Sequence, residues 1–396
     1  MAPPISPPLS PELPAPDAEA MRHGDRLRER IAKDVAEAGG WISFARYMEL
    51  ALYAPGLGYY VAGAAKLGEA GDFVTAPEIS PLFGETLAGQ VAQGLGAPAD
   101  EVLELGAGSG RLAAHLLLEL QAQDRLPARY LILEISPELA QRQRALLSRL
   151  CPALVGRVAW IDALPDRFEG VIVANEVLDA LPVHLVHWMP DGLFERGVAL
   201  REGAFAWEDR RLRPGALQDA TKALPVTPPY LSEISLASRA LVGALADCLQ
   251  RGVLLLVDYG FGRREYYHPQ RAQGTLMCHY RHRAHADPFH LPGLQDITAH
   301  VDFTAVAEAG IDAGLDLLGY TTQARFLVNA GLLQRLERRG AANPAREPLS
   351  YLPAAAGVQK LLSPAEMGEL FKVMALGRGA VAAPSGFAGG DLSRML

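Results

Sequence analysis

Three glycines at alternate positions, with an acidic residue just before them, are the part of this sequence with the clearest chemistry. The segment V-L-E-L-G-A-G-S-G-R-L, residues 102 to 112, places Gly106, Gly108 and Gly110 after an apolar run that contains Glu104. A strand, a glycine turn and a helix open a nucleotide-binding βαβ unit. Glycine is needed there because the backbone turns sharply, visits positive φ and lets a ligand approach without a Cβ in the way.

The spacing of these glycines separates two classes of nucleotide ligand. A dinucleotide fingerprint, G-x-G-x-x-G/A, needs a small residue at position 111, and this chain has Arg111 there. Its third glycine comes one residue earlier, which gives E-x-G-x-G-x-G, the version found in S-adenosylmethionine (SAM) methyltransferases. Glu134 ends the next apolar run, where a doubly wound fold places the carboxylate that accepts hydrogen bonds from a ribose diol. We therefore predict a SAM site, with the methionine part at the glycine loop.

Two other segments offer cofactor contacts. Asp162, followed by Ala163, comes after V-A-W-I and is placed to hydrogen-bond the adenine amino group; a helix cap or a solvated loop acid is the alternative. The segment G-D-F-V-T-A-P-E contains Asp72, Phe73 and Thr75. The ring of Phe73 is expected to contact the adenine or the sulfonium, since an aromatic face attracts positive charge, or else to anchor the core. We assign Thr75 to the cofactor and Asp72 to the substrate.

A cluster of acids follows the fourth predicted strand. In A-N-E-V-L-D-A-L-P, residues 174 to 182, Asn175 and Glu176 leave the sheet toward the expected cleft, and Asp179 follows three residues later. Clustered carboxylates suit a guanidinium, which favours planar bidentate contacts. We predict that Glu176 and Asp179 are catalytic and that Asn175 contacts the cofactor. The alternative is a helix cap at Asn175 with two solvated acids.

Three residues further along the chain are candidates for the acceptor side of the site. D-I-T-A-H-V-D-F contains His300 and Asp302, which either orient a substrate or form a polar link in the core. We assign His300 as a proton acceptor, and Asp302 together with Tyr259 to substrate binding. A single His-x-Asp supplies too few ligands for a metal site, and methyl transfer needs none.

Apolar strands alternate with helices, which predicts an α/β fold with a doubly wound parallel sheet and right-handed crossovers. Continuously apolar runs such as V-L-L-L-V indicate strands that are covered on both faces. The strands are expected at residues 101–104, 130–134, 157–160, 170–174 and 252–258, with the last two at 315–320 and 371–376.

Changes of pattern divide the chain into segments. Helices are expected at residues 25–40, 41–52 and 81–95. The predicted order begins with a tail at 1–24 and an N-terminal helical cap at 25–98. A SAM-binding core follows at 99–187, is interrupted by a β-hairpin insertion at 188–232, and continues at 233–262. A polar Arg- and His-rich substrate or lid loop at 263–302 then precedes the C-terminal part of the core at 303–383 and a loose tail at 384–396.

Composition and charge restrict the function. The chain has 396 residues, 49% of them hydrophobic, and its 37 basic and 45 acidic residues give a net charge of −8. An acidic chain is not expected to attract nucleic acid or anionic membranes in general. No apolar run approaches a membrane span, and the proline-rich start resembles neither a signal nor a transit peptide. A cytoplasmic location is therefore expected.

Several motifs together resemble the MidA-type family of SAM-dependent methyltransferases, which includes the mitochondrial arginine methyltransferase that assists assembly of respiratory complex I. The matching motifs occur in the family's order: G-D-F-V-T-A-P-E-I-S-P-L-F-G-E, E-L-G-A-G-S-G, L-E-I-S-P-E-L, A-N-E-V-L-D-A-L-P, G-T-L-M-C-H-Y-R-H-R-A-H, D-I-T-A-H-V-D-F and L-S-P-A-E-M-G-E-L-F-K-V-M-A-L. One departure is G-A-G-S-G where relatives are expected to have G-P-G-R-G. The resemblance implies a class I methyltransferase fold, SAM as cofactor and methylation of a protein arginine.

The function predicted from the sequence is therefore methyl transfer from SAM to an arginine of a protein partner, with a complex I subunit as one candidate and a homodimer as one possible assembly. Two alternatives stay open. One is methylation of a small molecule or a carboxylate, which a closed apolar pocket favours. The other is a SAM-binding assembly factor with little turnover.

Overall fold

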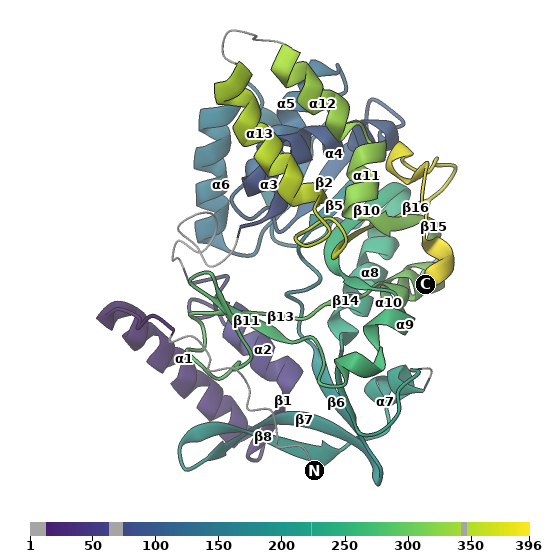
Figure 1. Cartoon of the computed structure of the whole chain (residues 1–396). Helices are drawn as coiled ribbons and strands as arrows, with labels where there is room; N and C mark the ends of the chain where they lie inside the picture. Colours follow the sequence, from purple (N-terminus) through teal and green to yellow (C-terminus); the bar gives the residue numbers. More distant parts are fainter. Residues whose placement is uncertain (1–12, 63–73, 223, 342–346) are drawn as a thin grey trace.

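A mixed β-sheet forms the centre of the computed structural model, which describes residues 13–62, 74–222, 224–341 and 347–396 (Figure 1). Its strand order is β15-β16-β10-β5-β2-β3-β4. The strands are β2 (Glu101–Leu105), β3 (Tyr130–Leu133), β4 (Val158–Ile161), β5 (Phe168–Asn175), β10 (Leu249–Phe261), β15 (Asp316–Thr322) and β16 (Phe371–Arg378). All seven strands predicted from the sequence are present, with ends that differ by a few residues.

The sheet is not parallel throughout. Strands β4, β3, β2, β5 and β10 run parallel to one another, but β16 pairs antiparallel with both β10 and β15. The prediction of a parallel sheet is therefore wrong at this edge. Helices α11 (Gln323–Asn329), α12 (Leu332–Ala341) and α13 (Glu347–Leu362) connect β15 to β16. After such a long connection, the direction of the next strand depends on the end of the sheet at which the chain re-enters. Hydrophobic periodicity does not encode this.

Helices cover both faces of the central sheet. One face packs against α4 (Pro81–Gly94), α5 (Arg111–Ala122), α6 (Pro137–Leu150) and α11 to α13; the other packs against α8 (Leu236–Cys248) and α10 (Phe303–Asp312). In β10, Val253 and Leu255 face the first layer, whereas Leu254 and Leu256 face the second. Burial on both faces explains the continuously apolar sequence of this strand.

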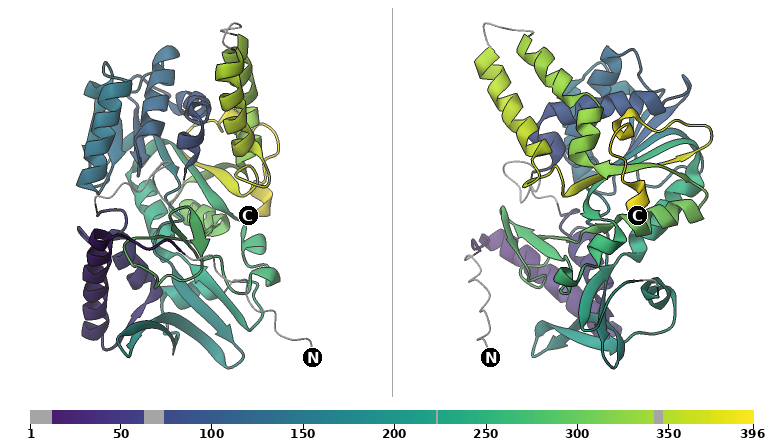
Figure 2. Two further views of the ribbon diagram at one scale, coloured as in Figure 1. Left: turned by 60° about the vertical axis from the view of Figure 1, so that its left-hand side comes forward. Right: turned by 45° about the vertical axis from the view of Figure 1, so that its right-hand side comes forward.

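A second, antiparallel sheet lies below the central one in Figures 1 and 2. Its order is β1-β7-β6-β9, and β8 pairs with β7. The strands are β1 (Trp41–Ser43), β6 (His184–Met189), β7 (Gly192–Arg201), β8 (Ala204–Arg211) and β9 (Tyr230–Ile234). Helices α1 (Ala18–Glu37) and α2 (Phe44–Tyr53) share a core with this sheet. The predicted β-hairpin insertion is thus part of a larger unit that includes the N-terminal helices.

The segment predicted as a polar connection, residues 263–302, contains a third sheet. It has the order β12-β11-β13, formed by β11 (Met277–Tyr280), β12 (Arg283–His285) and β13 (Asp296–Thr298). The short helix α9 (Arg263–Tyr266) precedes these strands, and β14 (Val301–Asp302) follows them and pairs with β10. Strands of three or four residues carry too little periodicity to be recognised from sequence.

The N-terminal elements differ from the prediction at their boundaries. The first helix begins at Ala18 rather than Asp25, and Asp17 caps it by accepting hydrogen bonds from two backbone N–H groups. The expected helix at residues 41–52 starts instead with strand β1, which pairs with β7, and Ser43 then caps α2. A three-residue edge strand depends on pairing with a partner that is distant in sequence. The local pattern does not contain this pairing, so it predicts a continuous helix.

Two further segments that were assigned to the periphery pack on the central sheet. Helix α4, which was expected in the N-terminal cap, shares the sheet's main core. Near the C-terminus, where a loose tail was expected, Phe387 is buried with its ring centroid 5.1 Å from that of Phe326. The N–H of Leu392 donates to the carbonyl oxygen of Tyr320 at 2.6 Å. The division into domains stays a prediction.

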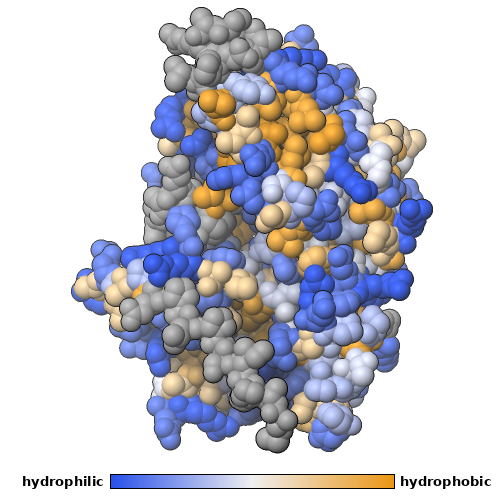
Figure 3. Space-filling model, viewed as in Figure 1, coloured by the Kyte–Doolittle hydropathy of each residue, from blue (hydrophilic) through white to orange (hydrophobic). Residues whose placement is uncertain are grey.

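Apolar side chains gather on the surface over α12 and α13 (Figure 3). Leu333 on α12 is 40% exposed and Leu352 on α13 is 64% exposed. This face belongs to the helical connection between β15 and β16.

Candidate functional site

The glycine loop after β2 has the backbone conformation that its sequence requires. The φ angles of Gly106, Gly108 and Gly110 are 58°, 54° and 86°, all in the left-handed region that favours glycine. The N–H of Gly106 donates to the carbonyl oxygen of Leu133, which joins the loop to the neighbouring strand β3. Gly110 is the N-cap of α5, so the loop delivers the start of a helix to the end of the sheet.

A cavity of about 550 Å³ opens beside this loop. It lies beyond the C-terminal ends of β2, β3, β5 and β10, where α/β sheets bind their ligands, and β11 and β13 of the third sheet form its opposite wall. Ten of the residues predicted from the sequence line it: Thr75, Glu104, Gly106, Gly108, Glu134, Asn175, Glu176, Asp179, Tyr259 and His300. The fold therefore brings most of the predicted residues together.

Four predicted residues do not line the cavity, and two lie outside the described residues. Gly110 packs against Gln143, and a Cβ added at Gly110 would lie only 3.3 Å from that residue. Asp162 and Ala163 are exposed after β4, and their assignment to adenine stays a prediction. Asp72 and Phe73 fall in residues 63–73, which are not described. The fourth residue is Asp302.

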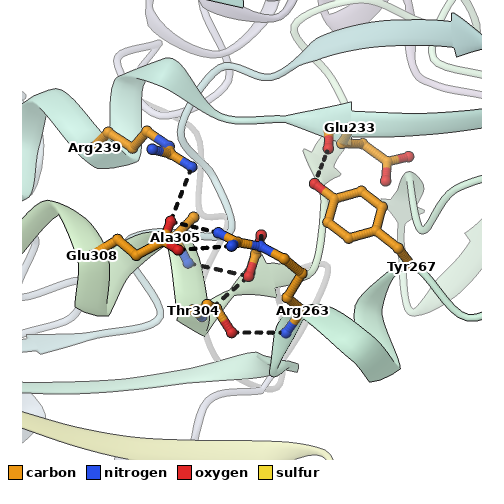
Figure 4. A network of polar contacts seen from close by, with 8 residues as sticks. Glu233, Arg239, Arg263, Tyr267, Thr304, Ala305 and Glu308 are labelled. Carbon is orange, nitrogen blue, oxygen red and sulfur yellow. Dashed lines mark hydrogen bonds and ion pairs between the residues drawn. The ribbon is translucent and has the colours of Figure 1, made fainter. Parts of the chain in front are cut away.

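Asp302 has a structural role that its sequence context did not reveal. Its carboxylate caps α10 by accepting from the N–H groups of Thr304 (3.1 Å) and Ala305 (3.2 Å), and it lies 3.9 Å from the guanidinium of Arg263. Arg263 also pairs with Glu308, which Arg239 approaches within 3.7 Å (Figure 4). The assignment of Asp302 to substrate binding is therefore not supported, because the carboxylate is used within this network.

Glu134 is held in place by a residue that sequence reasoning missed. The fully buried Gln143, on α6, donates from Nε2 to a Glu134 carboxylate oxygen (2.8 Å) and to the carbonyl oxygen of Gly108 (3.0 Å). Its own Oε1 accepts from the indole of Trp160 at 2.9 Å. Gln143 thus links the glycine loop to the acid expected to bind the ribose. A glutamine in an ordinary helix gives no sequence signal for this role.

Glu104 lies at the end of β2 with 2% of its surface exposed. The hydroxyl of Tyr130 donates to its carboxylate at 2.5 Å. Burial raises the pKa of the Glu104 carboxyl to about 7. A group that is partly protonated near neutral pH can both donate and accept hydrogen bonds at this edge of the cavity.

The acidic loop after β5 is held by Asp258, another residue missed from the sequence. Glu176 has a φ of 52°, which is uncommon for a residue with a side chain. The following N–H groups, those of Val177, Leu178 and Asp179, all donate to one carboxylate oxygen of Asp258 at 3.2, 2.8 and 3.3 Å. Successive N–H groups that converge on one acceptor form a nest. Asp258, on β10, therefore fixes the loop that carries Glu176 and Asp179.

The two predicted catalytic acids have raised pKa values. Burial, with a contribution from the nearby Asp179, raises the pKa of the Glu176 carboxyl to about 8. Burial also raises the pKa of Asp179 to about 6, although the hydroxyl of Tyr259 donates to it at 2.6 Å. At neutral pH Glu176 therefore keeps its proton to a large extent, whereas Asp179 is mostly ionised.

His300 is neutral at physiological pH. Burial lowers its pKa to about 4, and nearby Arg271 adds to this effect. Tyr259 and Phe261 meet its ring edge-on at 5.3 and 5.2 Å. Among the described residues, its Nδ1 has no hydrogen-bond partner. A neutral imidazole in the cavity wall can accept a hydrogen bond from a bound N–H group.

The backbone around His300 is anchored by a buried glutamate. The N–H of His300 donates to the hydroxyl oxygen of Thr275 at 3.1 Å. Glu233, which is 1% exposed, accepts from the N–H of Thr275 (2.9 Å) and from its hydroxyl (3.1 Å). The hydrogen-bonded series from Glu233 through Thr275 to His300 gives this side of the cavity a defined geometry.

The charge of the cavity is strongly one-sided. Among the residues that the structure describes, six carboxylic acids line it: Glu78, Glu104, Glu134, Glu176, Asp179 and Asp296. Within the described part of the chain, no lysine or arginine lines it, and its two histidines are His279 and His300. Focused negative potential in a cleft attracts cations and repels anions. The site therefore fits positively charged ligands.

The pH dependence of stability should reveal the buried Glu176 carboxyl. Its pKa is about 8 in the folded chain against an ordinary value of 4.5, so between these values the folded state holds a proton that the unfolded chain releases. The free energy of unfolding must then fall as pH rises through this window. The Glu176→Gln variant lacks this titration, and its melting temperature should exceed that of the wild type by an amount that grows from pH 5 to pH 8. A difference that stays constant over this range in scanning calorimetry would contradict the raised pKa.

The described ranges give no sign of a membrane-spanning helix or of a metal site. None of their helices has the length and apolar character needed to cross a membrane. They also contain no group of three or more His, Cys, Asp or Glu side chains placed to hold a metal ion.

Several proteins that this chain resembles are described as methyltransferases. Residues 85–321 match a family described as "Putative S-adenosyl-L-methionine-dependent methyltransferase". The protein arginine methyltransferase NDUFAF7 homolog of Drosophila melanogaster, a mitochondrial protein, is 30% identical over 96% of this chain and 91% of its own length. The mitochondrial protein arginine methyltransferase NDUFAF7 of Mus musculus is also 30% identical, over 91% of this chain and 86% of its own length.

A solved structure from Burkholderia thailandensis covers almost the whole chain. It is 51% identical, covers 97% of this chain and 100% of its own, and superposes with a TM-score of 0.93. That protein is described as a "likely methyl transferase" and was solved bound to S-adenosyl-homocysteine. The α/β fold with its mixed sheet is thus that of the class I methyltransferases, as the glycine loop predicted.

Proposed function

The chain belongs to this family of S-adenosyl-L-methionine-dependent methyltransferases, and from that membership we propose that it transfers a methyl group from SAM to an arginine nitrogen of a protein. The observation that carries the proposal is the cavity of six carboxylic acids without a described lysine or arginine. Both expected ligands, the sulfonium of SAM and a guanidinium, bring positive charge to it. Those acids that are ionised at neutral pH would repel an anionic acceptor group.

The residues beside the glycine loop fit SAM. The left-handed conformations of Gly106 and Gly108 leave the backbone open to close approach, and N–H groups at the start of α5 suit the methionine carboxylate. Glu134, aligned by Gln143, is placed to accept from the ribose hydroxyls. Support comes from the relative at 51% identity that binds S-adenosyl-homocysteine. When bound, SAM supplies an activated methyl group on a sulfonium.

The acidic loop supplies what a guanidinium needs in order to act as a nucleophile. A guanidinium keeps its proton below a pH of about 12, so its nitrogens are poor nucleophiles. Carboxylates of Glu176 and Asp179 that hold the positive charge on one side leave more electron density on the opposite nitrogen. The arriving cation also lowers the pKa of Glu176 from its value of about 8, so that this carboxyl ionises when the acceptor binds.

His300 and the packing of the site supply positioning. With a pKa of about 4, the imidazole is neutral and accepts a hydrogen bond from the acceptor's N–H rather than competing with it as a cation. Alignment of nucleophile, methyl and sulfur in a site that excludes water is the main contribution that the protein makes to methyl transfer.

The acceptor we propose is a protein, and a respiratory complex I subunit is the first candidate because of the resemblance of the motifs to the mitochondrial assembly enzyme. The relatives at 30% identity carry the name protein arginine methyltransferase. Candidate partner proteins incubated with the full chain and isotopically labelled SAM should acquire the label on arginine, as located by mass spectrometry of peptides. Label found only on carboxyl groups or on small molecules would contradict the arginine assignment.

A further inference from the structure

Two tyrosines and an aspartate from outside the central sheet line part of the cavity. Tyr53, at the end of α2, and Tyr60 stack with ring centroids 5.6 Å apart and planes inclined by 22°. The hydroxyl of Tyr60 donates to Oδ1 of Asp296 on β13 at 2.9 Å. The hydroxyl of Tyr53 donates to the carbonyl oxygen of Ala180, in the acidic loop, at 3.0 Å. All four residues line the cavity.

The inserted segments are joined to the acidic loop at this point. The N–H of Ala299, next to β13, donates to the backbone carbonyl oxygen of Asp179 at 3.0 Å. Each tyrosine hydroxyl donates a hydrogen bond within the protein, and these bonds hold the two rings in place. Tyr53 and Tyr60 therefore give the cavity an ordered aromatic wall, which also carries the Asp296 carboxylate.

Two buried polar atoms in this part of the cavity have no hydrogen-bond partner among the described residues. They are Oδ1 of Asp179, a residue 6% exposed, and the hydroxyl oxygen of Thr298, a residue 2% exposed. Both residues line the cavity. Buried polar groups are normally hydrogen-bonded, so the free carboxylate oxygen of Asp179 points to a ligand that donates a hydrogen bond there, and the Thr298 hydroxyl can donate or accept.

We propose that Tyr53, Tyr60, Asp296 and Thr298, together with Oδ1 of Asp179, form the acceptor subsite, which takes a planar guanidinium between the aromatic pair and the carboxylates. This proposal rests on the proposed function and names the residues that select its substrate. A guanidinium presents five donors in a flat fork and stacks on aromatic faces. A carboxylate on each side, Asp179 from the core and Asp296 from β13, accepts from opposite edges of such a fork.

The subsite gives the inserted segments a role in the site. The core sheet supplies the glycine loop, Glu134 and Glu176, which lie on the cofactor side and on one side of the acceptor. Asp296 and the two tyrosines come from the third sheet and from the N-terminal unit. Selection of the acceptor thus depends on segments outside the core fold.

The test uses the full chain saturated with S-adenosyl-homocysteine and two blocked amino acids as probes, N-acetyl-arginine methylamide and its uncharged citrulline counterpart. Binding is followed by NMR titration. The wild type should bind the arginine probe at least about ten times more tightly than the citrulline probe, since charged hydrogen bonds are roughly twice as strong as neutral ones. Asp296→Asn should weaken the arginine probe by about tenfold and leave the affinity for S-adenosyl-homocysteine within about threefold.

Asp209→Asn is the matched control. Its carboxylate is also partly buried and accepts from Arg196 and His187, but it lies in the second sheet and does not line the cavity. This variant should bind both probes as the wild type does. Tyr60→Phe keeps the ring but removes the hydroxyl that orients Asp296, so it should weaken the arginine probe by a smaller factor, and it carries the test if Asp296→Asn does not fold.

Equal affinity for the two probes, or an unchanged arginine probe in Asp296→Asn, would overturn the subsite. So would a parallel loss of S-adenosyl-homocysteine binding, which would show that Asp296 only maintains the fold. The proposed function can fail separately. If binding of the arginine probe depends on Asp296 while no protein arginine acquires label from SAM, the subsite stands and the arginine methyltransferase assignment falls.

Discussion

Replacement of Glu176 by glutamine is expected to lower the rate of methyl transfer at least about tenfold, while the affinity for S-adenosyl-homocysteine stays near that of the wild type. A hydrogen bond to a charged group contributes about 1.5–3 kcal/mol, and each 1.4 kcal/mol corresponds to about tenfold. Glutamine preserves the size of the side chain and the oxygen that accepts from the N–H of Ala76, but it removes the negative charge that holds a guanidinium. Initial rates with labelled SAM and calorimetry with S-adenosyl-homocysteine measure the two quantities.

Glu195→Gln provides the comparison for this experiment. Glu195 is also partly buried and pairs with His184 at 2.7 Å, but it lies on β7 of the second sheet and does not line the cavity. This variant should keep full activity. Full activity in Glu176→Gln would refute the catalytic role of that residue, and lost cofactor affinity in Glu176→Gln would move the residue to the cofactor side of the site.

The second large effect is expected at the glycine loop, where Gly106→Val should weaken the binding of S-adenosyl-homocysteine about a hundredfold or more. A left-handed backbone costs an L-residue about 1–2 kcal/mol, and a β-branched side chain adds to that cost. The new Cβ would lie 3.4 Å from a methyl group of Val177, and the rest of the side chain would occupy the space beside the loop. Calorimetry on the purified variant measures the loss.

Gly203→Val separates backbone strain from loss of the site. Gly203 also has a positive φ, 78°, but it lies between β7 and β8 with nothing within 4 Å of an ideal Cβ. Gly203→Val should therefore pay a similar conformational cost in stability and still bind S-adenosyl-homocysteine normally. Normal binding in Gly106→Val would contradict the placement of the cofactor. If Gly106→Val loses the cofactor but still supports maturation of a partner protein, the chain acts on that partner as an assembly factor rather than by methylation.

The sequence predicted the seven main strands of the central sheet and the cofactor loop because their signals are local. Apolar runs of four to eight residues bounded by turns identify buried strands, and glycines at positions 106, 108 and 110 report the backbone angles that the loop needs. The acids that follow strand ends, Glu134, Glu176 and Asp179, line the cavity because the C-terminal ends of neighbouring parallel strands share one edge of the sheet. These predictions needed no knowledge of distant contacts.

The tertiary structure alone decided which residues complete and orient the site. Asp258 lies about eighty residues after the Glu176 loop in sequence, but its carboxylate accepts hydrogen bonds from three N–H groups of that loop. Gln143 lies on an otherwise ordinary helix and links Glu134 to Gly108. Asp302 caps α10 instead of facing the cavity. The antiparallel direction of β16 depends, like these roles, on where separate segments meet. Periodicity and propensity describe neighbours along the chain, whereas hydrogen-bond partners and strand directions are set by packing between segments far apart in sequence.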